Sequence, residues 1–322
     1  MLPSLSEILS SLHVISLPMR TTFRGIDYRE VALFEGPYGW GEFSPFLEYD
    51  AVESSRWLAA GMEAAFQPTP PLLRQKISIN ATLPALDDEE GIARVLSWYP
   101  GAKSVKIKVG EDQAKNIARI ERVRSLYPSM AIRLDFNGSL TVDQAEEFLA
   151  PMSFREPTRI EYVEQPCETI EELRELKERI DIKIAVDEVI RKSDDPFALD
   201  LTGAADLVIL KVSPLGGIER SQRIASHFNL PVVVSSALES AVGITHGLRL
   251  AATLPHYDRA SGLATGALFT DDVLCHEISD GEIDLSHVKE VSRSAINRLA
   301  VAEERLTWWQ NRLRECYEVL AS

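Results

Sequence analysis

Five charged residues fall at the ends of five short apolar runs, at intervals of 23 to 29 residues. They are Lys108, Asp135, Glu164, Asp187 and Lys211. The runs are rich in β-branched residues, as buried parallel strands are, and helix-like stretches separate them. A repeated strand, crossover helix and strand predicts a (β/α) barrel, in which the carboxyl ends of the strands meet at one mouth. We therefore expect the five charges to line one site.

Composition narrows the class of protein. The chain has 322 residues, 45% of them hydrophobic, which is enough for a barrel and a smaller unit. Its formal charge of −15 argues against nucleic acid or an anionic membrane as a partner, because both require a basic face. Three cysteines without metal-type spacing favour a reducing cytoplasm. We expect neither a signal segment nor a membrane span, and a small-molecule carboxylate as the substrate. The oligomeric state stays open.

Three segments are expected along the chain. Residues 1–75 read as an α+β capping domain, residues 76–271 as the barrel, and residues 272–322 as a C-terminal segment that packs back on one of them. The pattern predicts helices at 4–12, 51–66, 112–126, 141–151, 169–180 and 297–320. It predicts capping strands at 14–18, 28–34 and 40–43, a first barrel strand at 76–82 and the last two at 231–235 and 261–265.

Three carboxylates, Asp135, Glu164 and Asp187, indicate a metal site. They offer hard oxygen ligands from neighbouring strands, without a thiolate or imidazole at those strand ends. Oxygen ligands favour Mg²⁺, with Mn²⁺ as a substitute. Each carboxylate alone is also consistent with a solvated loop residue or a helix cap. The set of three, flanked by lysines at matching positions, favours the metal.

The lysines indicate acid–base chemistry. Lys106 and Lys108 lie two positions apart on one strand, so both project into the barrel, and Lys211 enters the mouth from the far side. Amines facing each other across a dication are suited to removing the proton next to a carboxylate, because the metal stabilises the resulting enediolate. Neighbouring positive charge lowers the pKa of a lysine toward the range of a base. Lys108 ends its strand and is the better base, whereas Lys106 lies deeper and is expected to tune it.

The motifs, taken together, resemble a known family. Lys106-Ile-Lys108, Asp135-Phe-Asn137, Glu164-Gln-Pro166, Asp187-Glu188 and Lys211 are similar to the enolase superfamily, in its muconate-lactonizing-enzyme-like subgroup. The resemblance covers nearly the whole chain and implies an α+β cap on a modified barrel, bound Mg²⁺ and a lysine acid and base. The chain departs from the commoner pattern at Gln165, Val189 and Val212, and none of these replaces a ligand or a lysine.

Two further segments, 40–50 and 234–240, are similar to a dehydrating branch of that subgroup. This resemblance implies the syn dehydration of a hydroxylated cyclohexadiene carboxylate to an aromatic acid. Lys108 would then take the α-proton and return it to the departing hydroxyl. Lys211 would hold the opposite face of the ring by cation–π attraction.

Five residues are weaker candidates for substrate binding. Asn137 shares the inward face with Asp135, and Arg133 also points inward, although both are equally consistent with structural roles. Ser235 and Ser236 offer donors to a second substrate carboxylate or serve only as caps. Arg24 belongs to the segment 20–26, at the place of the family's substrate-covering loop, which is also consistent with a plain surface loop.

Two alternatives remain open from the sequence. A racemase of N-acylamino acids or an epimerase of dipeptides would use Lys108 and Lys211 as two bases, with Asp271 and Asp272 as candidates to hold a dipeptide amine. In a barrel with other chemistry, Gly216-Gly217 would cradle a phosphate. A phosphate site leaves the three carboxylates unexplained.

Overall fold

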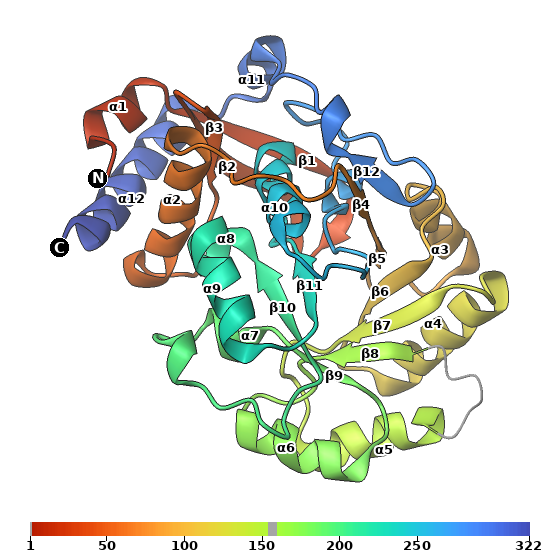
Figure 1. Cartoon of the computed structure of the whole chain (residues 1–322). Helices are drawn as coiled ribbons and strands as arrows, with labels where there is room; N and C mark the ends of the chain where they lie inside the picture. The colour runs from red at the N-terminus through yellow and green to blue at the C-terminus, as the bar shows by residue number, and fades with distance from the viewer. Residues whose placement is uncertain (1, 154–159) are drawn as a thin grey trace.

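The computed structural model describes residues 2–153 and 160–322. Its N-terminal unit packs two helices against an antiparallel sheet of order β1-β2-β3 (Figure 1). In chain order the elements are α1 (Leu5–Ser10), β1 (His13–Phe23), β2 (Ile26–Gly36), β3 (Gly39–Phe43) and α2 (Ala51–Phe66). The predicted helix at 51–66 is confirmed. It begins after Asp50, which caps its first turn, and it ends before Pro68.

A parallel seven-stranded sheet follows, curled with its helices on the outside (Figure 1). Its order is β11-β10-β9-β8-β7-β6-β5, so strands that follow one another in the chain are neighbours. The strands are β5 (Ala81–Leu83), β6 (Ser104–Lys108), β7 (Ala131–Asp135), β8 (Ile160–Glu164), β9 (Ile184–Val186), β10 (Leu207–Lys211) and β11 (Val232–Ser235). The predicted fold class, a (β/α) barrel with an α+β cap, is confirmed. The predicted strand before Glu164 began at Arg159, which lies outside the described residues.

Helices alternate with the strands, and the longer ones pack on the outside of the sheet (Figure 1). They are α3 (Glu89–Leu96), α4 (Gln113–Leu126), α5 (Val142–Ser153), α6 (Ile170–Arg179), α7 (Glu188–Arg191), α8 (Val212–Leu215), α9 (Ile218–Phe228) and α10 (Ala241–Thr253). The one-turn helices α7 and α8 start directly after Asp187 and Lys211, so the chain turns at the mouth.

The first and last barrel strands differ from the prediction. Residues 76–82 do not form one strand, because β4 (Lys76–Ser78) pairs antiparallel with β12 (Glu282–Asp284) and the barrel begins only at β5. The change of partner falls at consecutive amides: Ile79 donates to the carbonyl of Gly281, and Asn80 to that of Ser261. The predicted eighth strand at 261–265 is reduced to single parallel bridges at Ser261 and Gly262, which close the barrel between Ile79 and Ser235.

The C-terminal segment also differs from the prediction of one long helix. Two helices, α11 (Arg293–Leu299) and α12 (Glu303–Ala321), replace it. Between them the chain is extended, because Ala300 forms a bridge with Ile15 of the cap and Val301 donates to the carbonyl of Val14. Helix α12 lies against α2, and its Trp309 meets the ring of Phe43 edge-on at 5.8 Å.

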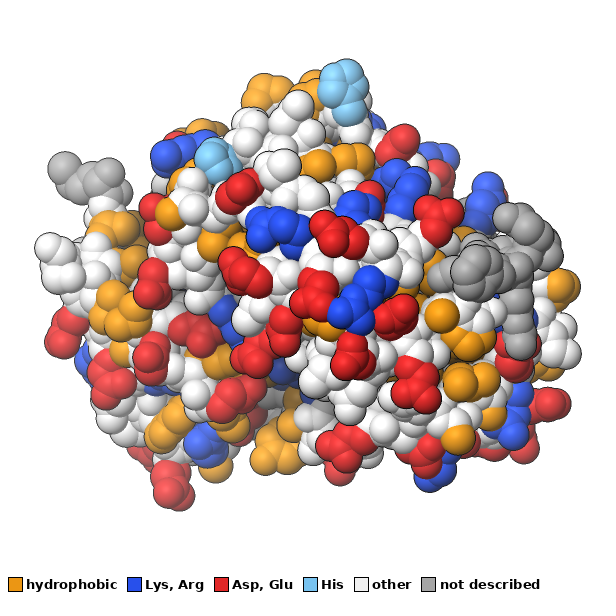
Figure 2. Space-filling model, turned by 90° about the horizontal axis from the view of Figure 1, so that it is seen from below, with side chains coloured by type: hydrophobic (Ala, Val, Ile, Leu, Met, Phe, Trp, Pro, Cys, Tyr) orange, Lys and Arg blue, Asp and Glu red, His pale blue; other side chains and the backbone are white. Residues whose placement is uncertain are grey.

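Two large hydrophobic cores and a small one hold the molecule together. One lies between the barrel strands and their helices, and another unites the capping domain with α11 and α12. A small cluster around Tyr162 fills the barrel interior. Acidic side chains are spread over the face seen in Figure 2, with lysines and arginines among them. None of the helices described is long and apolar enough to cross a membrane.

Candidate active site

The five charges predicted from strand ends meet at one mouth of the barrel. Lys108, Asp135, Glu164 and Lys211 are the last residues of β6, β7, β8 and β10, and Asp187 directly follows β9. The register places Lys108 beside Asp135 and Asp135 beside Glu164. Because all these strands are parallel, one edge of the sheet collects every side chain at its carboxyl end.

Lys106 lies between two of the carboxylates. Its Nζ is 3.1 Å from Asp135 Oδ2 and 3.1 Å from Glu164 Oε1, with Glu164 Oε2 at 3.2 Å. Burial opposes the charge on Lys106, but Asp135 and Glu164 outweigh burial and raise its pKa well above the ordinary value. Lys106 is therefore a cation that balances two acids, which is more than the expected tuning of Lys108.

Lys108 is more loosely held. Its Nζ is 3.7 Å from Asp135 Oδ1, and its side chain is partly exposed. Burial lowers the pKa of Lys108, and the cations of Lys106, Arg24 and Lys211 lower it further, while Asp135 opposes them. A lowered pKa favours the neutral amine, which is the form in which a lysine acts as a base.

Asp187 is held from two sides. Lys211 Nζ donates to Asp187 Oδ2 at 2.5 Å, and Arg191 Nε lies 3.3 Å from each carboxylate oxygen and donates to Oδ2. Burial alone would raise the pKa of Asp187, but Lys211 and Arg191 outweigh it and lower that pKa.

The other two acids differ from each other. For Asp135, Lys106, Lys108 and Lys211 outweigh burial and hold the pKa at about 2. For Glu164, burial wins and raises the pKa to about 7, although Lys106 partly offsets it. A dication between the three carboxylates would favour the charged form of each.

The donor set fits a hard dication. Oδ1 of Asp135 and Oδ1 of Asp187 are buried and accept no hydrogen bond, so each has an oxygen left for a ligand. In the described part of the chain no three carboxylate, imidazole or thiolate groups are gathered around one point, and the acids turn to Lys106 and Lys211 instead. Oxygen donors from Asp135, Glu164 and Asp187 match the preference of Mg²⁺.

Two of the weaker candidates have partners of their own. Arg133 faces inward as predicted, but its guanidinium donates to Glu161, Asn80 and the carbonyl of Ala260 instead of to a carboxylate of the mouth. Asn137 donates from Nδ2 to Glu188 Oε1 at 3.0 Å. These contacts favour structural roles, and substrate binding by either residue stays a prediction.

The remaining candidates lie at different depths. Ser235 is buried and pairs in register with Lys211, whereas the hydroxyl of Ser236 is 2.7 Å from that of Thr265. Arg24 occupies the turn between β1 and β2, with its guanidinium 4.1 Å above the ring of Phe46. Substrate contacts of these three residues also stay predictions.

Several residues at the mouth escaped the sequence analysis. Gln165 was noted only as a departure, yet its Oε1 accepts from the amides of Asp187 and Val189 and its Nε2 donates to the carbonyl of Cys167. Glu188 appears there only within the motif Asp187-Glu188, and Arg191 does not appear. The spacing of Arg191, four residues after Asp187 at the start of a helix, is a local signal that would have found it.

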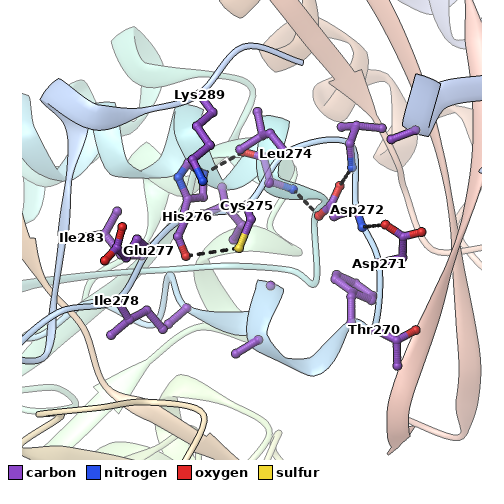
Figure 3. Close-up of a pocket in the computed structure, with 18 of the residues that line it drawn as sticks. Thr270, Asp271, Asp272, Leu274, Cys275, His276, Glu277, Ile278, Ile283 and Lys289 are labelled. Carbon is purple, nitrogen blue, oxygen red and sulfur yellow. Dashed lines mark hydrogen bonds between the residues drawn. The ribbon is translucent and has the colours of Figure 1, made fainter. Parts of the chain in front are cut away.

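The residues named for the two alternatives lie elsewhere or are occupied. A cavity of about 670 Å³ is lined by Asp271, Asp272, Cys275, His276 and Lys289 (Figure 3). There Asp272 accepts from the amides of Ala241 and Val273, and Asp271 pairs with Arg298, which leaves neither free for a dipeptide amine.

The proposed phosphate cradle after Gly216-Gly217 is filled from within the chain. Glu63 of the cap accepts from the amides of Ile218 and Glu219, the first residues of α9. A carboxylate therefore already occupies the position that an anion would take.

Comparisons with known proteins agree with this geometry. The family described as enolase N-terminal domain-like matches residues 14–65, and the one described as enolase C-terminal domain-like matches residues 92–287. An o-succinylbenzoate synthase of Mycobacterium marinum is 45% identical over 98% of this chain and 96% of its own length. One of Mycolicibacterium smegmatis is 45% identical over 99% of this chain and 98% of its own.

Solved structures at low sequence identity share the fold. Muconate lactonizing enzyme from Pseudomonas putida superposes with a TM-score of 0.74 at 18% identity, covering 90% of this chain and 98% of that one. The L-Ala-D/L-Glu epimerase from Bacillus subtilis superposes with a TM-score of 0.71 at 20% identity, covering 87% and 96%.

Proposed function

This chain is an enzyme of the enolase superfamily and belongs to its o-succinylbenzoate synthase family, and from that premise we propose its reaction and mechanism. The reaction is the syn dehydration of 2-succinyl-6-hydroxy-2,4-cyclohexadiene-1-carboxylate to o-succinylbenzoate, a hydro-lyase step of menaquinone biosynthesis. The observation that carries it is the convergence of Lys108, Lys211 and three carboxylates at one barrel mouth.

Lys108 performs the proton transfers. Its lowered pKa favours the neutral amine, which is the form that takes the proton next to the substrate carboxylate. The resulting ammonium then protonates the departing hydroxyl on the same face of the ring. One C–H bond and one C–O bond break, one water leaves, and the ring becomes aromatic. A single group on one face accounts for syn stereochemistry.

Lys211 holds the opposite side of the mouth. It comes from β10, four strands away from β6 in the sheet, and its ammonium faces Asp187 at 2.5 Å. A fixed cation there attracts the face of the ring as it becomes aromatic. Lys106 holds Asp135 and Glu164 in place and favours the charged form of each.

Asp135, Glu164 and Asp187 would hold Mg²⁺, or Mn²⁺ in its place, which supplies Lewis-acid stabilisation of the charge that develops on the substrate carboxylate. The substrate is a small carboxylate, and neither nucleic acid nor a membrane is expected to bind. The described cysteines are all free, which supports a reducing cytoplasm as the location.

The direct test is turnover of the cyclohexadiene substrate with Mg²⁺, followed by absorbance of the aromatic product. We expect the wild type to turn over, and EDTA treatment and Lys108→Ala each to abolish the reaction. Lys103→Ala is the matched control, because Lys103 precedes the same strand and is exposed. An active Lys108→Ala variant would refute the assignment of the base.

Racemisation of N-acylamino acids or epimerisation of dipeptides is the second candidate. It is favoured by the entry of Lys108 and Lys211 from opposite sides, as a two-base reaction requires. Exchange of the α-hydrogen of these substrates for solvent deuterium, without dehydration of the cyclohexadiene, would move the assignment to this activity.

A further inference from the structure

The contacts that orient Asp187 form a chain that extends beyond the barrel mouth. Lys211 and Arg191 both donate to Oδ2 of Asp187, while Oδ1 is buried without a hydrogen bond. Oδ2 is therefore fixed by two hydrogen bonds, whereas Oδ1 lies 3.3 Å from Arg191 Nε without a hydrogen bond and is left for a ligand. Asp187 receives no capping bond from its own helix, so its orientation depends on these two cations.

Arg191 divides its guanidinium among three partners. Nε reaches Asp187, Nη2 donates to Glu188 Oε1 at 2.7 Å, and Nη1 donates to the hydroxyl of Tyr49 at 3.1 Å. The residue is only 6% exposed. Because a guanidinium is planar and rigid, a shift at any one of these contacts turns the other two.

Tyr49 belongs to the capping domain. It lies in a short loop, residues 46–49, where its amide donates to the carbonyl of Phe46 at 3.2 Å and its ring meets that of Phe46 edge-on. This loop is part of the connection between β3 and α2, and the hydroxyl of Tyr49 is its contact with Arg191 of the barrel. Because Arg191 donates to the hydroxyl of Tyr49, a movement of the cap would shift the guanidinium of Arg191.

The C-terminal helix holds the same loop. Nη2 of Arg312, on α12, lies 2.7 Å from the carbonyl of Phe46, 2.9 Å from that of Tyr49 and 3.0 Å from Ser54 Oγ. Arg312 is 8% exposed, and its guanidinium also packs over the rings of Trp308 and Trp309. The carbonyls of both ends of the loop are therefore fixed by one buried cation.

We propose that Arg312, Tyr49 and Arg191 form a positioning relay through which the C-terminal helix and the cap set the orientation of Asp187, and with it the affinity of the site for a divalent cation. The proposal rests on the proposed metal site, but not on the identity of the substrate. Contiguous contacts alone do not establish coupling, so the test measures coupling directly.

The competing interpretation is that Arg191 only neutralises the buried charges of Asp187 and Glu188. The two interpretations differ at Tyr49, which is uncharged and touches no carboxylate in the relay. Tyr49→Phe removes a single hydroxyl and keeps the ring against Phe46. A charge-balancing role predicts unchanged cation affinity in this variant, whereas the relay predicts a loss.

The experiment is titration of the full-length protein with Mn²⁺, followed by electron paramagnetic resonance, together with thermal unfolding of the cation-free protein. We expect Arg191→Lys to weaken Mn²⁺ binding by about 10- to 100-fold, as loss of a group that orients a ligand does. Tyr49→Phe should weaken it by roughly three- to ten-fold, the effect of one hydrogen bond. Arg312→Lys should also weaken Mn²⁺ binding, because a compact ammonium group replaces the planar guanidinium that holds the loop.

A double variant tests whether the contacts act in series. If Arg312 works through Tyr49, Arg312→Lys combined with Tyr49→Phe should weaken Mn²⁺ binding by less than the product of the two single effects. Tyr38→Phe is the matched control, because Tyr38 lies in another turn of the cap and is 54% exposed. It should bind Mn²⁺ as the wild type does.

Three results would overturn the relay. One is wild-type Mn²⁺ affinity in Tyr49→Phe, and another is a fall in the unfolding midpoint of all three variants with unchanged affinity. A wild type that binds no Mn²⁺ would remove the metal site and the relay together. Failure to dehydrate the cyclohexadiene with normal Mn²⁺ binding would refute only the proposed reaction.

Discussion

Two groups of buried carboxylates in this molecule differ in what faces them. At the barrel mouth, Asp135 and Asp187 face ammonium and guanidinium groups. Where the first residues of α10 meet the cap and the C-terminal segment, Glu42 accepts from Gly243 N at 2.9 Å and from both the amide and the hydroxyl of Ser240, while Asp272 accepts from Ala241 N at 2.8 Å. The hydrogen-bond partners of these two acids are amide and hydroxyl dipoles instead of cations.

The difference appears in their protonation. Cations hold the pKa of Asp135 at about 2, despite burial. Burial raises the pKa of Glu42 to about 7, with the charge of nearby Glu239 adding to the effect, and burial raises the pKa of Asp272 to about 7 as well. Glu164 lies between these cases, because it is bonded to Lys106 and burial nevertheless raises its pKa to about 7. The balance between burial and the facing cations therefore decides whether a buried acid is charged at neutral pH.

The interface acids also restrict the packing at the start of α10. Gly243 has no room for a side chain, because a Cβ there would lie 2.6 Å from Cβ of Glu239 and 2.9 Å from Glu42 Oε2. The cap therefore supplies N-terminal capping groups to two barrel helices, Glu42 to α10 and Glu63 to α9. These contacts fix the cap beside the strands that carry Lys211 and Ser235.

The largest expected effect is at the mouth. Asp187 balances the charges of Lys211 and Arg191 and would offer an oxygen to the proposed metal. We therefore expect Asp187→Asn to lower kcat/KM by at least about 10³-fold. Glu42→Gln, the matched change at the interface, should lower it by less than about 10-fold, because Glu42 touches no reacting group. If steady-state kinetics showed comparable losses of kcat/KM in the two variants, the contrast between the two groups of carboxylates would be wrong.

Metal binding should stabilise the mouth. If the carboxylates hold Mg²⁺ only in the folded state, Mg²⁺ at one hundred times its Kd should raise the free energy of unfolding by about 2.7 kcal/mol. Denaturant unfolding with and without Mg²⁺ measures this. The stabilisation by Mg²⁺ should vanish in Asp187→Asn and persist in Glu42→Gln. If Mg²⁺ stabilised neither the wild type nor Glu42→Gln, the metal site would be contradicted.

Glu42 and Asp272 should make the free energy of unfolding depend on pH, with a sign opposite to that of the contribution from Asp135. Between the ordinary carboxyl pKa and about 7, folded Asp272 and Glu42 bind protons that the unfolded chain does not, so stability falls as pH rises through this window. The contribution of Asp135 is present above its ordinary pKa and is lost only as pH falls toward about 2.

Unfolding free energies measured from pH 5 to 8 test this sign. We expect the decline with rising pH to be on the order of 1 kcal/mol for each unit of pKa shift. Asp272→Asn should reduce the slope without abolishing it, because Glu42 and Glu164, whose pKa values are also raised to about 7, still titrate. Asp271→Asn should reduce the slope less, because the charge of Asp271 only adds to the raised pKa of Asp272. An unchanged slope in Asp272→Asn would show that Asp272 is already charged.

The smallest effect is expected where a carboxylate belongs to neither group. Asp271 pairs with Arg298 at 2.8 Å, with both side chains substantially exposed. Arg298→Ala should change the free energy of unfolding by about 0–1 kcal/mol, since solvent screens such a pair. A larger loss would mean that the C-terminal segment depends on this contact.

Much of the site was predictable because its position follows from local pattern. A charged residue that ends a β-branched run must reach the mouth once the strands are parallel, which places Lys108, Asp135, Glu164 and Lys211 together. Helix α2 was predicted to the residue, because its apolar period and its cap at Asp50 are local features.

Errors arose where distant segments compete for the same backbone. The predicted strand at 76–82 is divided because β12 takes its first part as a partner, and the predicted helix at 297–320 is interrupted because Ala300 pairs with Ile15. Neither partner is near in sequence, so periodicity alone extends each element too far.

The sequence by itself determined the barrel, the cap and the ring of charged strand ends, because strand and helix periods and strand-end positions depend on near neighbours in the chain. Only the tertiary structure decided which donor faces each acid. Lys106 bridges Asp135 and Glu164, and Arg312 reaches the loop of Tyr49 across more than two hundred and fifty residues of chain. Such pairings depend on how separate segments pack, and the pairing in turn sets the charge and orientation of each carboxylate.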